Sequence, residues 1–195
     1  MKAGGDFPHS NRGDVAEWVR VFLPTVPAVL VPSLGVGDTQ VLTGQGAGDP
    51  IVDEVNSLGF TGISIGAAGD DFHWLWDIPF NLSTEAPVKI SAVWSSSSAD
   101  TAEGLTWKIL YHQTAFGAAH AAAATALDTA IADDMCISAY ALQKTEAGLI
   151  NSATLDPAKM LHILCECDAA VGAMNLGTDV VFLHGIMIEY LRAKL

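Results

Sequence analysis

Basic residues are scarce in this chain of 195 residues: nine Lys and Arg stand against 22 Asp and Glu, which gives a net charge of −13 at pH 7. Affinity for nucleic acid comes mainly from basic side chains that neutralise phosphates. Attraction to an anionic membrane surface needs basic clusters in the same way. The charge balance therefore argues against nucleic acid and membranes as partners, whereas a partner with a basic surface is compatible with it.

Cysteine is also scarce, and a long uninterrupted apolar run is missing. The three cysteines, Cys136, Cys165 and Cys167, are too few and odd in number for a disulfide framework. The first ten residues lack the apolar run of a signal peptide, and prolines interrupt the most apolar early stretch, residues 21–36. These features predict a chain that folds in a cytoplasm with its thiols reduced.

Motifs that would carry chemistry are missing as well. The sequence has no Gly-x-Ser-x-Gly nucleophile elbow and no His-x-His or His-Glu-x-x-His spacing for a metal. Cys165 and Cys167 stand two residues apart in an apolar alternation, which places both thiols on the buried face of a strand. The acid pairs 70–71 and 133–134 lack the spacing of a calcium loop, so we expect solvated turn residues. We predict no catalytic residue, no metal and no cofactor, and therefore no enzyme.

Apolar residues are plentiful, at half of the composition, and from about residue 59 they alternate with polar ones. Segments 72–78, 88–94 and 105–111 each place large apolar side chains on one face, and 161–167 repeats the pattern. A period of two indicates strands with one buried face. Polar turns at roughly 10- to 20-residue intervals favour an antiparallel sandwich over alternating strands and helices. The sequence therefore predicts an all-β, antiparallel β-sandwich.

Three other segments complete the expected body of the fold. Residues 116–131 are Ala-rich and predict at most one short helix. Residues 135–142 predict a strand, with a turn at Gly148. Residues 179–191 are apolar on both faces, which predicts a strand in the centre of a sheet or against another subunit.

Tryptophans stand in phase with the aliphatic residues of the alternating segments. Trp74, Trp94 and Trp107 each share a face with Ile or Leu neighbours. A sugar-binding platform of aromatic residues would instead break that phase. We therefore predict that these three side chains lie in the core, and that His73, His112 and His162 point away from the apolar faces of their strands.

Residues 1–58 differ from the rest in composition, because they are rich in Gly and Pro. The prolines between residues 22 and 32 exclude a helix and an inner strand. We predict an extended N-terminal arm over 1–58, with one or two edge strands, and a sandwich domain over 59–195. A free arm would expose apolar surface, so we expect it to bind a neighbouring subunit. The expected partner-binding residues of the arm are Trp18, Val21, Phe22, Leu23, Val29, Leu30 and Val31.

Three segments of the body carry a resemblance to a known group of proteins. They read Phe72-His-Trp-Leu-Trp-Asp-Ile-Pro-Phe, Pro87-Val-Lys-Ile-Ser-Ala-Val-Trp and Gly104-Leu-Thr-Trp-Lys-Ile-Leu-Tyr. This pattern resembles β-sandwich structural proteins of tailed bacteriophages, including capsid decoration, cement and head-fibre proteins. In that group an aromatic strand ending in Ile-Pro leads to an Ile/Val-Trp strand, a polar turn and a Gly-x-Val/Leu-x-Trp strand. The resemblance covers roughly residues 59–112.

The resemblance implies a jelly-roll-like fold, no catalysis and a homo-oligomer, commonly a trimer, on the capsid surface of a virion. The implied partners are the major capsid protein lattice and copies of the chain itself. The expected function is therefore that of a non-enzymatic decoration or cement protein, made in the host cytoplasm, that stabilises the shell. The alternative is a carbohydrate-binding β-sandwich module, such as a receptor- or glycan-binding fibre protein.

Overall fold

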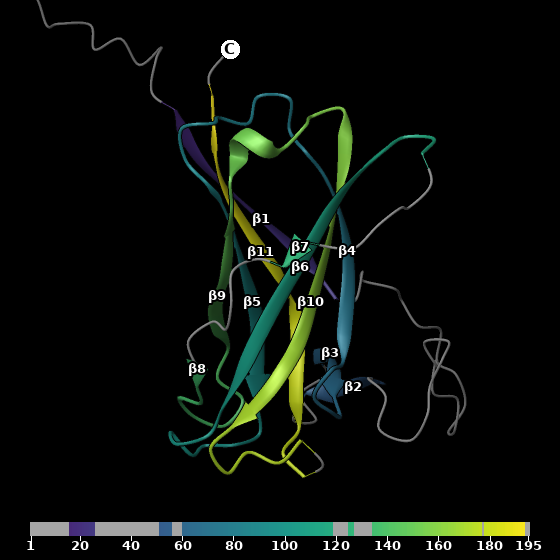
Figure 1. Cartoon of the computed structure of the whole chain (residues 1–195). Helices are drawn as coiled ribbons and strands as arrows, with labels where there is room; N and C mark the ends of the chain where they lie inside the picture. The colour runs from purple at the N-terminus through teal and green to yellow at the C-terminus, as the bar shows by residue number, and fades with distance from the viewer. Residues whose placement is uncertain are drawn as a thin grey trace, which may run out of the picture.

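The structure is a computed structural model (Figure 1), and it describes residues 16–25, 51–55, 60–118, 125–126, 134–176 and 178–193. These residues form eleven strands and one short 3-10 helix. In chain order the elements are β1 (Glu17–Pro24), β2 (Ile51–Val55), β3 (Phe60–Ile65), β4 (Asp71–Asp77), β5 (Val88–Ser96), β6 (Gly104–Ala115), β7 (Thr125–Ala126), β8 (Asp134–Met135), β9 (Gln143–Ile150), η1 (Ser152–Thr154), β10 (Lys159–Val171) and β11 (Val181–Arg192). No helix in the described ranges is long and apolar enough to cross a membrane.

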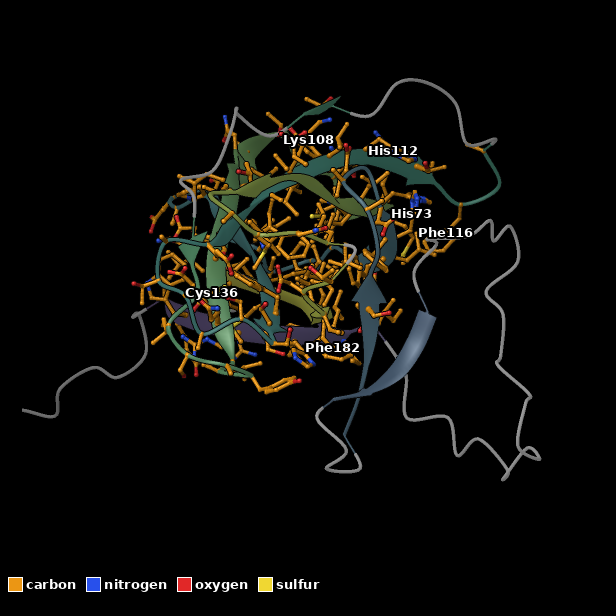
Figure 2. All side chains as sticks on the ribbon, turned by 90° about the horizontal axis from the view of Figure 1, so that it is seen from below. His73, Lys108, His112, Phe116, Cys136 and Phe182 are labelled. Carbon is orange, nitrogen blue, oxygen red and sulfur yellow. The ribbon has the colours of Figure 1, made fainter. Side chains whose placement is uncertain are left out.

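The strands form two antiparallel sheets with side chains packed between them (Figure 2). The first sheet has the order β2-β3-β11-β5-β9, with β1 also paired to β11, and the second has the order β4-β10-β6-β7, with β8 beside β6. The pairs are nested in the chain: β3 with β11, β4 with β10, β5 with β9, and β6 with β7. This double-sheet arrangement is that of a jelly roll. The predicted antiparallel, jelly-roll-like β-sandwich is confirmed.

The core lies between the sheets, and two of the predicted tryptophans occupy its centre. Trp94 on β5 and Trp107 on β6 are both fully buried, with ring centroids 6.1 Å apart. The Trp94 Nε1–H donates to Thr145 Oγ1 at 2.8 Å. Cys165 and Cys167 on β10 are buried in the same cluster, which confirms that their shared face is the core face.

The third predicted core tryptophan, Trp74, is only half-buried, because β4 is the edge strand of the second sheet. Its indole N–H donates to the carbonyl oxygen of Pro24 at 3.1 Å. Trp74 packs against the margin of the core cluster rather than within it. The side chain therefore covers the seam between the two sheets.

Strand β11 is central, as its two apolar faces predicted, but a β-bulge changes which residues share a face. The register opposite β5 shifts between Leu183 and Gly185, and an extra residue in one strand reverses the alternation beyond it. As a result Leu183 and Ile186 both belong to the core cluster. Phe182 is buried on the other face, where its ring lies 6.5 Å from that of His184.

The strand predicted at residues 135–142 is wrong. Of these residues only Met135 belongs to a strand, as the last residue of β8, and residues 136–142 form a loop. Ile137 in this loop is 70% exposed, and Tyr140 has a φ of 58°. That left-handed backbone is incompatible with an extended strand.

The strand of this region is instead β9, and the predicted turn at Gly148 is also wrong. Gly148 lies inside β9, next to a register shift opposite Ile90. The core face of β9 carries Gln143 and Thr145, both of which are 4% exposed. Because these buried residues are polar, the apolar period that marks the other strands is absent here.

The predicted Ala-rich helix falls largely outside the described residues. Within 116–131, residues 116–118 form a turn, and Thr125–Ala126 form β7 in antiparallel pairing with β6. The prediction of a helix is therefore wrong at these positions.

Two described segments of the predicted arm belong to the body of the same chain. Strand β1 pairs with β11 over its full length, and β2 pairs with β3. Strand β3 covers only residues 181–183 of β11, which leaves the remaining side of β11 open for β1. For these segments the expectation of an arm that binds only a neighbouring subunit is wrong. The other residues of 1–58 lie outside the described ranges.

Candidate partner-binding surfaces

Pairing with β11 divides the predicted partner-binding residues of β1 between two faces. Val21 and Leu23 are half-buried and pack against the core of their own chain, so their assignment to a partner is corrected. Trp18 and Phe22 point the other way and are 55% and 45% exposed. The remaining predicted residues, Val29, Leu30 and Val31, lie outside the described residues.

The described residues hold no group of three or more His, Cys, Asp or Glu arranged to bind a metal ion. Asp70 Oδ2 accepts the backbone N–H groups of Gly66 and Ala67 at 2.9 and 3.0 Å. This is the turn role predicted for Asp70. Asp133, of the second acid pair, lies outside the described residues.

The three cysteines are buried and unbridged. Burial, with the Asp70 carboxylate as the next cause, raises the pKa of Cys167 from its ordinary 9.0 to about 12. Burial also raises the pKa values of Cys165 and Cys136. The thiolate is the nucleophilic and metal-binding form of cysteine, so a raised pKa keeps all three thiols unreactive at neutral pH.

We expect three thiols to react with a chromogenic disulfide in denaturant without reductant, and none to react rapidly in the native protein at pH 8. Because the folded pKa values lie above the unfolded ones, the stability that these groups contribute is complete below about pH 9. It is lost as the pH rises from 9 toward the folded pKa of about 12. A single reactive thiol in denaturant would reveal a disulfide and contradict this assignment.

The described histidines lie away from the core. On the outer face of the second sheet, the rings of His112 and His162 stack with centroids 4.3 Å apart, and His73 is exposed on β4. Figure 2 places His73 and His112 on the same side of the molecule. These positions confirm the predicted direction of the three side chains. His184 Nε2 lies 2.8 Å from Ser95 Oγ, and burial lowers its pKa.

A groove of about 630 Å³ opens where the end of β1 meets β4 and β10. Trp74 lines it, but its indole N–H is already bound to Pro24. Of the described residues that line the groove, none is an Asp, Glu, Asn or Gln, the side chains best suited to bind sugar hydroxyls. The groove therefore offers mainly apolar and imidazole surface. Its lining residues are Leu23, Pro24, Thr25, His73, Trp74, Leu75 and His162.

One end of the sandwich combines exposed apolar side chains with an excess of acids. We call it the acidic end; Figure 2 views the molecule from it, and it lies at the bottom of Figure 1. Its described acids are Asp70, Asp100, Glu103 and Asp179, and its described loops contain no Lys or Arg. Its exposed apolar residues are Ile137, Leu142 and Val180, at 70%, 69% and 38% exposure. The acidic end consists of loops 66–70, 97–103, 136–142, 172–176 and 178–180.

Hydrogen bonds connect the loops of the acidic end. The Tyr140 N–H donates to the Ser96 carbonyl oxygen, and the Ser97 N–H donates to that of Val180 at 2.8 Å. The Val180 N–H in turn donates to Ser97 Oγ at 2.9 Å. Loops that are already ordered lose little conformational entropy when a partner binds. The apolar side chains of this end are therefore presented on a preorganised surface.

The carboxylates of the acidic end stabilise its turns without a basic partner in these loops. Asp100 Oδ1 accepts the Ala102 N–H at 2.8 Å, and Asp179 Oδ2 accepts the Asn175 N–H at 2.7 Å. A hydrogen bond from an amide leaves the charge of the carboxylate in place. The acidic end therefore carries a concentrated negative charge.

The opposite end, formed by loops 78–87, 116–118 and 151–158, has a different character. It exposes Phe80 and Phe116, at 75% and 78%. One of its acids, Asp156, forms an ion pair with Lys159 at 3.2 Å. The opposite end is thus aromatic and less strongly charged.

No protein-family model and no curated protein matches the chain. Among solved structures, the chain is similar to a chain in a structure of infectious bursal disease virus, Gx strain, with a TM-score of 0.39 and 12% sequence identity. The match covers 99% of this chain and 36% of that chain. This chain therefore spans about a third of the length of the chain that it matches.

Proposed function

We propose that this chain is a non-enzymatic structural protein of a bacteriophage virion, a decoration or cement protein that binds the major capsid protein lattice and stabilises the shell. The jelly-roll topology supports this role, because the same architecture builds viral shell domains as well as lectins. The resemblance of segments 72–80, 87–94 and 104–111 to phage decoration proteins supports it independently. The protein is made in the host cytoplasm and resides on the capsid surface.

The acidic end carries the proposal, and we assign it to the contact with the shell. Exposed Ile137 and Leu142 supply apolar area for the centre of an interface. The acids around them match a partner surface that has an apolar patch and a basic rim. Because no Lys or Arg of the described loops offsets these acids, the partner supplies the positive charge.

Sedimentation with shells assembled without this chain tests the proposal. The purified chain should sediment with the shells to a fixed stoichiometry and raise their melting temperature. The double variant Ile137→Ser, Leu142→Ser should bind about tenfold more weakly or worse, because it removes the apolar centre of the contact. Binding should also weaken as salt is raised.

The opposite end provides a matched control. The double variant Phe80→Ser, Phe116→Ser replaces two equally exposed apolar residues and should bind shells like the natural chain. If the chain remains in the supernatant at every concentration, it is not a decoration protein. If only the Phe80 and Phe116 variant loses binding, the contact with the shell lies at the opposite end.

A second candidate function is glycan binding, and one surface favours it. Trp18 is exposed on the outer face of β1, on the same face as the ion pair between Arg20 and Glu189. An exposed indole can stack on a sugar ring, and the charged groups can bind its hydroxyls. A glycan-array signal that disappears in Trp18→Ala would favour this candidate over shell decoration.

A further inference from the structure

Strand β1 is regular along its whole length and has one open side. It pairs with β11 at all eight positions without a register shift, and no described strand pairs with its other side. Edge strands are normally protected from further pairing by bulges, by shortness, by charges that point inward, or by charged side chains and Pro on the strand. The inward side chains of β1 are Val19, Val21 and Leu23, and its only proline, Pro24, stands at its end. The one charged side chain in its central part, Arg20, is bound to Glu189 of its own chain.

Hydrogen bonds at the end of β1 establish which backbone groups face the open side. The Thr25 N–H donates to the His184 carbonyl oxygen at 2.9 Å, so Thr25 faces β11. Successive residues of a strand direct their N–H and C=O groups to opposite sides. Trp18, Arg20 and Phe22 therefore direct theirs to the open side.

Pro24 agrees with this alternation. It has no N–H, which suits a position that faces away from the neighbouring strand. Its carbonyl oxygen accepts the indole N–H of Trp74, which belongs to the other sheet. Trp74 therefore closes one end of the open side, and the hydrogen-bonding groups from Trp18 to Phe22 are directed outward.

We propose that two copies of this chain associate through β1, in an antiparallel pair with the two-fold axis at Arg20. In this register Trp18 lies opposite Phe22 of the partner subunit, and the reverse pair forms by symmetry. The three outward-facing residues of each copy exchange about six backbone hydrogen bonds. The exposed aromatic side chains form cross-strand pairs of the kind that stabilise sheets.

The charge at this edge permits two copies to approach, although the chain carries −13 overall. Arg20 binds Glu189 through Nε and Nη2, at 2.9 and 2.7 Å. Lys144 binds the same carboxylate, and Arg192 pairs with Glu17. On β1 and β11 these groups comprise two cations and two carboxylates, and Lys144 reaches Glu189 from β9, so the named charges give this part of the sheet no excess of negative charge. Repulsion between the copies is therefore small where the two strands meet.

The pairing is independent of a role in a virion, and it differs from the trimer that the phage resemblance implies. An interface that uses the same strand on both copies is isologous, and it closes at two subunits. In a trimer, the open edge of each β1 would contact a different surface of the neighbouring subunit, so the two β1 edges could not pair with each other. The geometry of the edge favours a dimer.

Cysteine cross-linking of the full chain tests both the pairing and its register. The three native cysteines are buried, so they contribute little background. Arg20→Cys should give a disulfide-linked dimer on oxidation with copper phenanthroline, because directly opposed residues at a hydrogen-bonded position lie about 5.5 Å apart. Trp18→Cys and Phe22→Cys should each remain unlinked alone, because each lies about 13 Å from its own copy. A mixture of these two variants should form a linked heterodimer.

Light scattering on the natural chain, without shells or glycans, provides the second measurement. The mass should rise with concentration from 20.4 kDa toward twice that value. Arg20→Pro removes an outward N–H and leaves the hydrogen bonds to β11, so it should weaken the dimer at least about tenfold. The cross-linking variants decide the matter if Arg20→Pro does not fold. A monomeric or trimeric mass, or cross-linking of Trp18→Cys alone, would overturn the proposal.

Discussion

Replacing Trp94 by Ala is expected to lower the free energy of unfolding by about 3–5 kcal/mol. The Trp94 side chain is fully buried, packs against Trp107 and donates a hydrogen bond to Thr145. Alanine would leave a cavity between the two sheets and would remove the indole donor from Thr145. The loss is a large part of the 5–15 kcal/mol that holds a typical domain together. Urea denaturation followed by circular dichroism measures it.

Phe116→Ala serves as the control for Trp94→Ala. The Phe116 ring is 78% exposed, so its removal should change the free energy of unfolding by no more than about 0.5 kcal/mol. Equal stabilities for the two variants would contradict the burial of Trp94. That result would also revive the interpretation of the tryptophans as a sugar-binding platform.

Alternation of apolar residues predicted strands wherever the core face is uniformly apolar. Strands β5, β6 and β10 meet this condition, and their buried residues are those that the pattern selects. Strand β9 fails it, because Gln143 and Thr145 occupy its core face. An alternating sequence pattern shows which face of a strand is apolar, but it does not show which face is buried. A strand whose buried face carries polar residues is therefore not recognised from the pattern.

Two errors have their cause in contacts between distant parts of the chain. Simple alternation along β11 places Leu183 and Ile186 on opposite faces, but the register shift between Leu183 and Gly185, which exists only relative to β5, brings both to the core face. Composition places residues 17–24 in an arm, although Val19, Val21 and Leu23 alternate with exposed residues in the manner of a half-buried strand. That alternation was the available signal. The pairing of residues 17–24 with β11 is possible because β3 covers only three residues of that strand.

The acidic end was not visible in the sequence for a similar reason. Asp70, Asp100, Glu103 and Asp179 are spread over more than half of the chain, and each by itself resembles an ordinary turn residue. Only the nested pairing of a jelly roll brings their loops to one end of the sandwich. The sequence could therefore predict acidic turns, but their convergence required the topology.

Gly185→Ala tests the attachment of β1 to β11, and it should destabilise the protein by about 2–3 kcal/mol. Gly185 has a φ of +156°, and a Cβ placed there would lie 2.3 Å from the Leu23 carbonyl oxygen and 2.8 Å from the Phe22 ring. A backbone oxygen cannot give way without a shift of β1 itself. Hydrogen exchange should therefore accelerate most at residues 17–24, because these amides lose their register with β11.

Gly117→Ala separates this steric effect from backbone strain. Gly117 also has a positive φ, +80°, but no atom lies within 4 Å of a Cβ placed there. Its replacement should cost only the conformational penalty of a left-handed residue, about 1–2 kcal/mol, and should leave exchange in β1 unchanged. Equal losses for the two variants, with unchanged exchange at residues 17–24 in both, would mean that β1 does not lie against Gly185. Because the same strand forms the proposed dimer edge, Gly185→Ala should also reduce the linked dimer formed by Arg20→Cys, whereas Gly117→Ala should not.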